Sequence, residues 1–82
     1  MSEKTYQSKL IKEYQSQGWY VIKIIKASPN GLPDLLMLKK GVDPLFIEVK
    51  GEKGRLSELQ KYRINELNSL GFNAKVSYEK SN

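Results

Sequence analysis

Residues 31–50, GLPDLLMLKKGVDPLFIEVK, constrain the fold more than any other part of the chain. They contain two runs rich in Leu, Ile, Val, Phe and Met, residues 34–39 and 45–50, whose composition is typical of largely buried strands. Between these runs, residues 40–44 include the glycine and the proline that mark a turn. The pattern predicts a β-hairpin.

The hairpin would bring two acidic residues together. Asp34 and Glu48 each lie seven residues from Gly41, so an antiparallel pair centred on Gly41 places their Cβ atoms roughly 5 Å apart on one face. Like charges in this arrangement repel, and oxygen ligands suit Mg²⁺ or Mn²⁺, so a divalent cation is the expected partner. Lys50 lies two residues beyond Glu48 and points to the same face. Register is the critical assumption, because a slip of one residue would put the carboxylates on opposite faces.

The chain before the hairpin predicts one helix and one strand. Ser2 is a suitable N-cap and Gly18 a suitable end for a helix over residues 3–17. Its core-facing positions recur at helical spacing: Tyr6, Leu10, Ile11 and Tyr14. Residues 19–25 are β-branched and aromatic and predict a strand. The following loop, residues 26–33, leads directly into Asp34.

The chain after the hairpin predicts a second helix and a last strand. Ser57 and Gln60 have the spacing of a capping box, and the helix should end at Gly71. Its mostly apolar stripe comprises Leu59, Tyr62, Arg63, Leu67 and Leu70. Residues 72–78 alternate between apolar and polar and predict a strand, and residues 79–82 a polar tail. The order is therefore αβββαβ, in a single domain over residues 1–82.

Composition excludes several classes of function. The 82 residues include no cysteine and no histidine, which excludes disulfide scaffolds, thiolate or histidine zinc sites and Ser-His-Asp triads. The net charge of +5 favours polyanionic partners such as nucleic acid. No apolar run is long enough for a membrane span, and the N-terminus lacks the apolar core of a signal peptide, so we expect an intracellular protein.

Three motifs resemble those of a known nuclease family. Pro33-Asp34 followed by Glu48-Val49-Lys50 resembles the PD-(D/E)XK signature. Together with residues 31–35, 46–50 and the run GRLSELQ at 54–60, the pattern is similar to the VRR-NUC branch, which includes short stand-alone proteins, many from bacteriophages. The resemblance covers about residues 3–78. It implies an α/β fold of the restriction-endonuclease type, with the αβββαβ core and a mixed sheet flanked by helices.

The resemblance also implies a function and a set of site residues. The function is Mg²⁺- or Mn²⁺-dependent endonuclease cleavage of DNA, and similarity to Holliday-junction resolvases implies a homodimer that acts on branched DNA. Asp34, Glu48 and the backbone carbonyl of Val49 would bind metal, and Lys50 would act on the attacking water. The family implies further catalytic roles for Glu3 and Gln60, although Glu3 also suits a helix start and Gln60 a capping box, and the two roles of Gln60 would compete geometrically.

Basic and polar residues near the predicted site are candidates for nucleic-acid contacts. They lie in the loop before Asp34, in the segment after Lys50 and at the start of the second helix: Lys26, Ser28, Lys53, Arg55 and Lys61. A phosphate backbone is bound chiefly by such groups. Simple solvent exposure is the alternative for each of them, and also for Arg63.

Three other interpretations of the sequence remain. Asp34, Glu48 and Lys50 would also be explained by a surface salt bridge. The same fold could form a catalytically silent module that binds nucleic acid, although two carboxylates near phosphate do not help a binder. A partner chain could complete the small core, which is compatible with nuclease activity.

Overall fold

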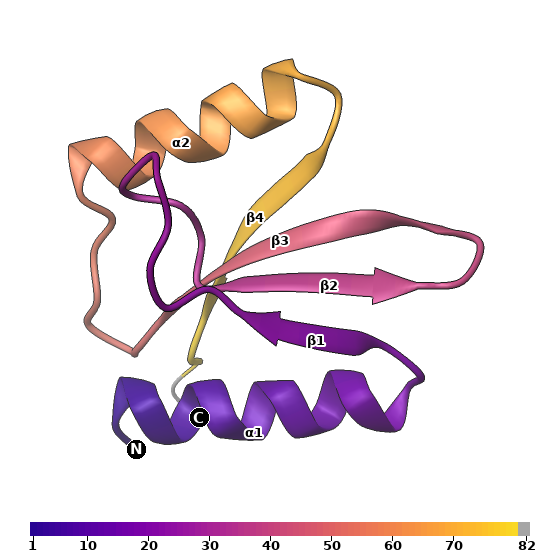
Figure 1. Cartoon of the computed structure of the whole chain (residues 1–82). Helices are drawn as coiled ribbons and strands as arrows, with labels where there is room; N and C mark the ends of the chain where they lie inside the picture. Colours follow the sequence, from indigo (N-terminus) through magenta and orange to yellow (C-terminus); the bar gives the residue numbers. More distant parts are fainter. Residues whose placement is uncertain (81–82) are drawn as a thin grey trace.

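The computed structural model describes residues 1–80, and residues 81–82 of the predicted tail lie outside this part. It contains two helices and four strands in the predicted order: α1 (Glu3–Ser16), β1 (Tyr20–Lys23), β2 (Leu35–Lys39), β3 (Val42–Lys50), α2 (Glu58–Ser69) and β4 (Asn73–Tyr78). The α/β class and the αβββαβ order are confirmed. Figure 1 shows the sheet between the two helices, with the β2–β3 hairpin extending away from both.

The four strands form one mixed sheet in the order β1-β2-β3-β4. β1 pairs antiparallel with β2, and β2 antiparallel with β3. β4 pairs parallel with β3, and α2 provides the connection that a parallel pair requires. The central position of β3 places the Glu48 segment between two neighbouring strands.

The hairpin has the predicted register over most of its length. Leu35 lies opposite Ile47, Leu36 opposite Phe46 and Met37 opposite Leu45, as pairing about Gly41 requires.

The predicted five-residue turn is wrong. β3 begins at Val42, so only Lys40 and Gly41 connect the strands, and Gly41 has a φ of 77°. Pro44 lies inside β3, where it has no N–H to donate to the ladder. The register shifts between Met37 and Lys39, across from Pro44, which is how sheets commonly accommodate a proline.

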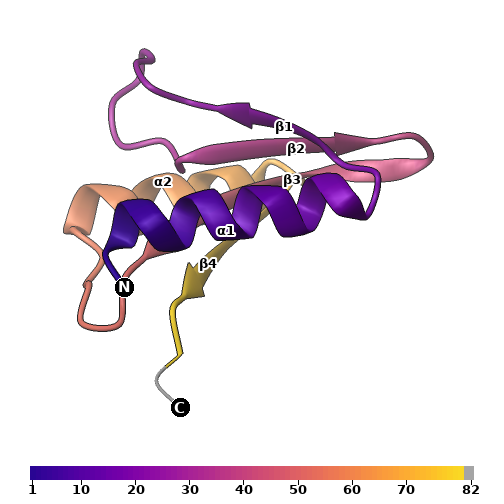
Figure 2. The ribbon, with the colours of Figure 1, turned by 90° about the horizontal axis from the view of Figure 1, so that it is seen from below.

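The core lies between the sheet and α1. Leu35, Met37, Ile47 and Val49 are fully buried, and Leu10 of α1 packs on them. These strand residues alternate with polar or half-buried ones, so one sheet face is apolar and covered by α1, which crosses it in Figure 2. The predicted core positions on α1 are confirmed, because Tyr6, Ile11 and Tyr14 pack against the same cluster.

Both helix starts have the predicted caps. The Ser2 side chain accepts a hydrogen bond from the N–H of Thr5, and Ser57 and Gln60 form a complete capping box. α1 ends before Gly18, whose φ of 92° is costly for other residues. β1 is shorter than predicted, because Lys23 ends its ladder and Ile25 is 89% exposed.

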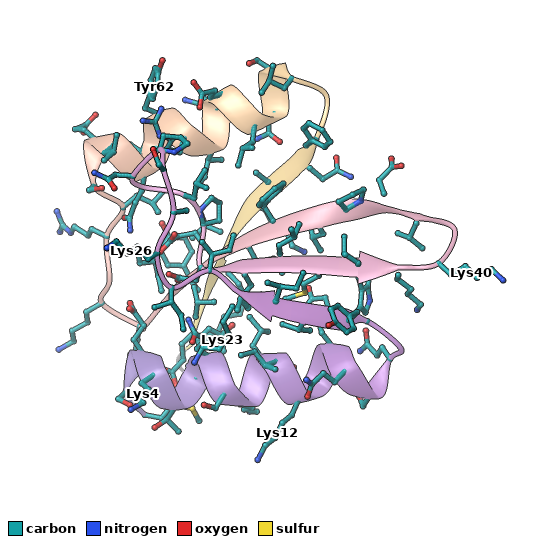
Figure 3. All side chains as sticks on the ribbon, viewed as in Figure 1. Lys4, Lys12, Lys23, Lys26, Lys40 and Tyr62 are labelled. Atoms are coloured by element: carbon teal, nitrogen blue, oxygen red, sulfur yellow. The ribbon has the colours of Figure 1, made fainter. Side chains whose placement is uncertain are left out.

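The predicted apolar stripe of α2 is mostly uncovered. α2 contacts β4 but has no buried residue, and Tyr62 and Leu70 are more than half exposed. Figure 3 shows Tyr62 pointing away from the sheet. α2 therefore covers only part of the sheet face opposite α1.

Candidate metal centre

Asp34 and Glu48 lie on the same face of the hairpin, opposite the core. Leu35 and Ile47 point into the core, so their neighbours Asp34 and Glu48 point to the other side. Two hydrogen bonds fix Asp34 just before β2. Its carbonyl oxygen accepts from the N–H of Ile24 at 2.7 Å, and its Oδ2 accepts from the N–H of Val49 at 3.0 Å.

Glu48 is buried and has two polar partners besides Asp34. Its relative exposure is 3%. Gln60 Nε2 donates a hydrogen bond to Glu48 Oε2 at 3.3 Å, and Lys50 Nζ lies 3.8 Å from the same oxygen. The two carboxylates and the lysine are thus together, as the sequence predicted.

The pKa of Glu48 is raised from 4.5 to about 8. Burial is the largest cause, followed by the negative charge of Asp34 and a hydrogen bond with its carboxyl group. Lys50 acts in the opposite direction, and Glu3 adds to the increase. Without a compensating cation, the pair of carboxyl groups therefore holds a proton at neutral pH.

The backbone carbonyl of Val49 faces the same region as Asp34. In a strand, the N–H and the C=O of one residue point to the same side. The N–H of Val49 donates to Asp34, so its carbonyl also points toward the β2 side, at the position where β2 has not yet begun. Asp34, Glu48 and this carbonyl are the three oxygen donors that the sequence analysis expected as metal ligands.

Gln60 forms the predicted capping box and also contacts Glu48. Its Oε1 accepts from the backbone N–H of Ser57 at 2.9 Å, and its Nε2 donates to Glu48. The Oγ of Ser57 accepts from the N–H of Gln60 at 3.1 Å. The two contacts do not exclude each other, because the two ends of one amide point in different directions, and the cap orients the amide nitrogen toward Glu48.

Glu3 lies at the margin of the site. Its Oε1 accepts a hydrogen bond from the N–H of Gly51 at 3.1 Å, and its charge contributes to the raised pKa of Glu48. Glu3 is exposed, which agrees with its position in the first turn of α1. The first turn of α1 is therefore joined to the end of β3.

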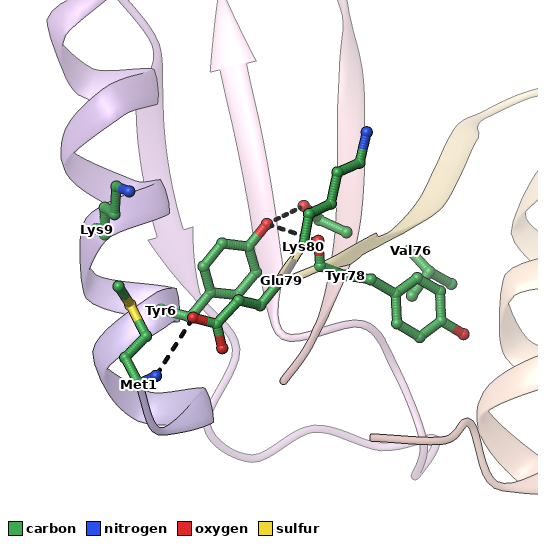
Figure 4. A pocket seen from close by; sticks show the side chains of 8 residues that line it. Met1, Tyr6, Lys9, Val76, Tyr78, Glu79 and Lys80 are labelled. Carbon is green, nitrogen blue, oxygen red and sulfur yellow. Dashed lines mark hydrogen bonds and ion pairs between the residues drawn. The ribbon is translucent and has the colours of Figure 1, made fainter. Parts of the chain in front are cut away.

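The chain ends hold the start of α1 in place. The Met1 ammonium lies 3.5 Å from Glu79 Oε2, and the Tyr6 hydroxyl bonds to Ser77 Oγ at 2.9 Å and donates to the Tyr78 carbonyl at 3.2 Å. These residues line a cavity of about 580 Å³, shown in Figure 4, which does not include Asp34 or Glu48. The cavity is thus a feature of the α1–β4 contact and not of the carboxylate pair.

The candidate nucleic-acid-binding residues are all on the surface. They lie on the β1–β2 loop, on the β3–α2 segment and on the first turns of α2: Lys26, Ser28, Lys53, Arg55 and Lys61. Figure 1 shows both of these connections at the end of the molecule opposite the hairpin tip. Lys61 forms an exposed ion pair with Glu58 at 3.3 Å, which costs little to break.

Arg63 is a residue whose contacts the sequence did not reveal. It was expected to be solvated or to meet phosphate, but its side chain is only 17% exposed and its Nε donates to the carbonyl of Asn30 at 2.7 Å. Its position three residues after Gln60 was the available signal, because residues at that spacing share a helix face.

The carboxylate pair meets only part of the requirements for a metal site. No group of three or more His, Cys, Asp or Glu residues that could hold a metal occurs within residues 1–80. The donor set still fits a hard cation, because Mg²⁺ is commonly bound through one or two carboxylates, with waters and substrate phosphates completing its octahedron.

A mixed sheet with the order αβββαβ and an acidic pair beside a lysine is the arrangement of PD-(D/E)XK nucleases. Comparison with protein families gives a match to the VRR-NUC domain over residues 4–79. The chain belongs to this family, which is of a nuclease type and implies DNA as the substrate. Comparison with curated proteins and with solved structures gives no significant match. Within residues 1–80, no helix is both long and apolar enough to cross a membrane.

Proposed function

We propose that the protein is a Mg²⁺- or Mn²⁺-dependent DNA endonuclease, with residues 1–82 as one domain. The observation that carries the proposal is the buried Glu48, with Asp34 beside it on one face and Lys50 Nζ 3.8 Å from its Oε2. A surface salt bridge does not explain this arrangement, because Glu48 is 3% exposed and has a second carboxyl group as its neighbour.

The metal ligands in this proposal are Asp34, Glu48 and the carbonyl of Val49. The raised pKa of Glu48 supports their choice, since the cost of two adjacent carboxylates is removed by a cation of charge +2. A bound Mg²⁺ or Mn²⁺ would polarise the scissile phosphate and lower the pKa of water.

The other site residues act on the water and on the ligands. Lys50 holds the attacking water by a hydrogen bond from Nζ and offsets the negative charge that develops on the phosphate. Gln60 orients Glu48 through its Nε2, and Glu3 adds negative charge at the margin of the site. Each of these groups is fixed by the end of β3 or by a helix start.

The proposed DNA surface surrounds the carboxylates. Lys26 and Ser28 on one connection, Lys53 and Arg55 on the next, and Lys61 on α2 are exposed, and phosphate contacts would replace the weak ion pair of Lys61 with Glu58. One connection leads into Asp34 and the other begins after Lys50, which suits contacts with the backbone of a duplex bound at the site. Two such surfaces in a homodimer would suit branched DNA, with a four-way junction as the preferred substrate.

The proposed homodimer is supported by the exposed surface of the chain. Its accessible surface is 5805 Å², whereas a compact monomer of this mass exposes about 5000 Å². We assign the dimer interface to the uncovered apolar residues of α2 and of the α2–β4 connection, namely Tyr62, Leu70 and Phe72, which are 46–67% exposed.

One observation favours a second candidate function, a catalytically silent DNA-binding module. The part of the chain that the structure describes offers only two close carboxylates and no group of three acidic or histidine ligands. A nuclease that has lost metal affinity would keep the same fold and the same basic surface.

Cleavage of labelled DNA by the purified protein separates these functions. The substrates are a four-way junction, a flap and a linear duplex, each with Mg²⁺, Mn²⁺ or EDTA, and the variants are Asp34→Ala and Lys50→Ala. The nuclease predicts metal-dependent cuts that both variants lose, with the junction cut best. Tight binding without cutting under any metal condition would favour the silent module.

A further inference from the structure

The loop that leads to Asp34 has little packing of its own. Residues 24–34 connect β1 to β2 and contain no helix or strand. The loop surrounds a cavity of about 180 Å³ that is lined only by residues between Ile24 and Leu32. Because the loop encloses a cavity instead of packed side chains, it needs contacts with another part of the protein to hold one conformation.

Arg63 of α2 supplies this contact through a backbone hydrogen bond. Its Nε donates to the carbonyl of Asn30 at 2.7 Å. Two further contacts hold the guanidinium: Glu66 Oε1 accepts from Nη1 at 3.3 Å, and the Tyr62 ring centroid lies 5.2 Å from Cζ. The guanidinium is therefore engaged in contacts within the protein, so phosphate binding is not its main role.

Gly31 allows the loop to approach α2 closely. A Cβ at Gly31 would lie 2.6 Å from Cγ of Leu59 and 3.3 Å from Cγ of Arg63, and the φ of 83° also favours glycine. Residues 30–31 are thus seated on the first two turns of α2. From this contact the chain passes through the buried Pro33 to Asp34.

We propose that Arg63 is a positioning residue of the metal centre, which acts on Asp34 through the Asn30–Gly31 segment. The same face of α2 contacts Glu48 through Gln60, three residues earlier. One helix therefore contacts both Glu48 of β3 and the loop that ends at Asp34, and so helps to set the relative position of the two carboxylates. The link of Arg63 to metal binding rests on the proposed function. The effect of its contact with Asn30 on the position of Asp34 is testable without metal.

The first test measures amide hydrogen exchange in EDTA. The N–H groups of Ile24 and Val49 both bond to Asp34, so their exchange rates report the position of this residue. The variants are Arg63→Met, which keeps an unbranched apolar stem, and Lys40→Met, which makes the same charge change at the hairpin tip (Figure 3). We expect Arg63→Met to lower the protection of these two amides by about tenfold and Lys40→Met to leave it unchanged.

The second test measures Mn²⁺ affinity by calorimetry. Loss of a group that orients a metal ligand typically lowers affinity by about 10- to 100-fold, and this loss is expected for Arg63→Met alone. Unchanged protection of Ile24 and Val49 in Arg63→Met would overturn the proposal. A loss of protection spread equally over β2 and β3 would also overturn it, because it would indicate only a general role in stability. Failure of the unsubstituted protein to bind Mn²⁺ would count against the proposed function, while the exchange result would still decide the role of Arg63.

Discussion

The carboxylate of Asp34 accepts a hydrogen bond from the backbone N–H of Val49 at 3.0 Å. Asp34 precedes the first residue of β2, so this bond continues the pairing with β3 through a side chain where the backbone hydrogen bonds have stopped. It holds Asp34 against the residue that follows Glu48, so the two carboxyl groups remain close although the backbone pairing has ended. The negative charge of Asp34 is one reason for the raised pKa of Glu48.

Asp34→Asn is expected to separate activity from stability. The amide oxygen of asparagine can still accept from the N–H of Val49, so the fold should persist. Loss of the negative charge lowers the pKa of Glu48, so the free energy of unfolding in EDTA at pH 8 should rise or stay constant. Cleavage should fall by about 10²-fold or more, because a metal ligand is lost.

Asp43→Asn is the matched control for this substitution. Asp43 is exposed near the hairpin tip, so the same chemical change there should leave cleavage intact. A large loss of stability in Asp34→Asn would contradict the view that the two carboxylates repel each other in the metal-free protein.

The stability of the metal-free protein should fall as the pH rises from about 4.5 to about 8. In this interval the folded protein keeps a proton on Glu48 that the unfolded chain has already lost. The contribution of this group is thus fully present below about pH 4.5 and absent above about pH 8. The expected decrease is roughly 2–5 kcal/mol, measured by urea unfolding in EDTA.

Glu48→Gln should remove this dependence. Glutamine keeps the volume and one acceptor for Gln60 but does not titrate, so the variant should be more stable than the unsubstituted protein at pH 9 without metal. Parallel pH profiles for the two proteins would show that another group is responsible.

Comparison of Gln60→Ala with Ser57→Ala separates the cap from the metal site. Each substitution removes one hydrogen bond of the capping box and should cost about 1 kcal/mol of stability. Only Gln60→Ala also removes the donor to Glu48, so cleavage should fall about 10- to 100-fold in this variant and stay nearly constant in Ser57→Ala. Equal losses of cleavage in both would assign Gln60 to the cap alone.

Leu70→Glu should dissociate the proposed homodimer. Leu70 is 67% exposed at the end of α2, and a carboxylate in an apolar interface would be desolvated without a partner. Light scattering at micromolar concentration should give a dimer mass before the substitution and a monomer mass after it. Ile25→Glu, at an 89% exposed loop position outside this interface, should remain dimeric.

The hairpin and its acidic pair could be predicted because they depend on local rules. Alternation places Asp34 and Glu48 on one face once the register is known, and the chain position of Gly41 gives the correct register for Leu35 with Ile47. The helix caps at Ser2 and Ser57 are equally local. For this reason these parts of the sequence analysis agree with the structure.

The missed features depend on distant contacts or on local competition. The bond of Arg63 to Asn30 joins residues 33 positions apart, so helical spacing shows which face Arg63 shares with Gln60 but not which loop it contacts. The exposure of the α2 stripe could not be predicted, because periodicity shows which residues share a face but not whether another element covers it. The turn was misplaced because Pro44 was taken as a strand breaker, whereas β3 accommodates it beside an irregular register.

The measurement that tests the central claim most directly is calorimetric titration of the protein with Mn²⁺ at pH 7 in buffers of different ionisation enthalpy. If Asp34 and Glu48 hold the cation together, Mn²⁺ should bind and displace the proton from Glu48, and Asp34→Asn should weaken this binding by about 10-fold or more. Binding of equal strength in Asp34→Asn, or binding without proton release, would contradict a metal centre at this pair of carboxylates.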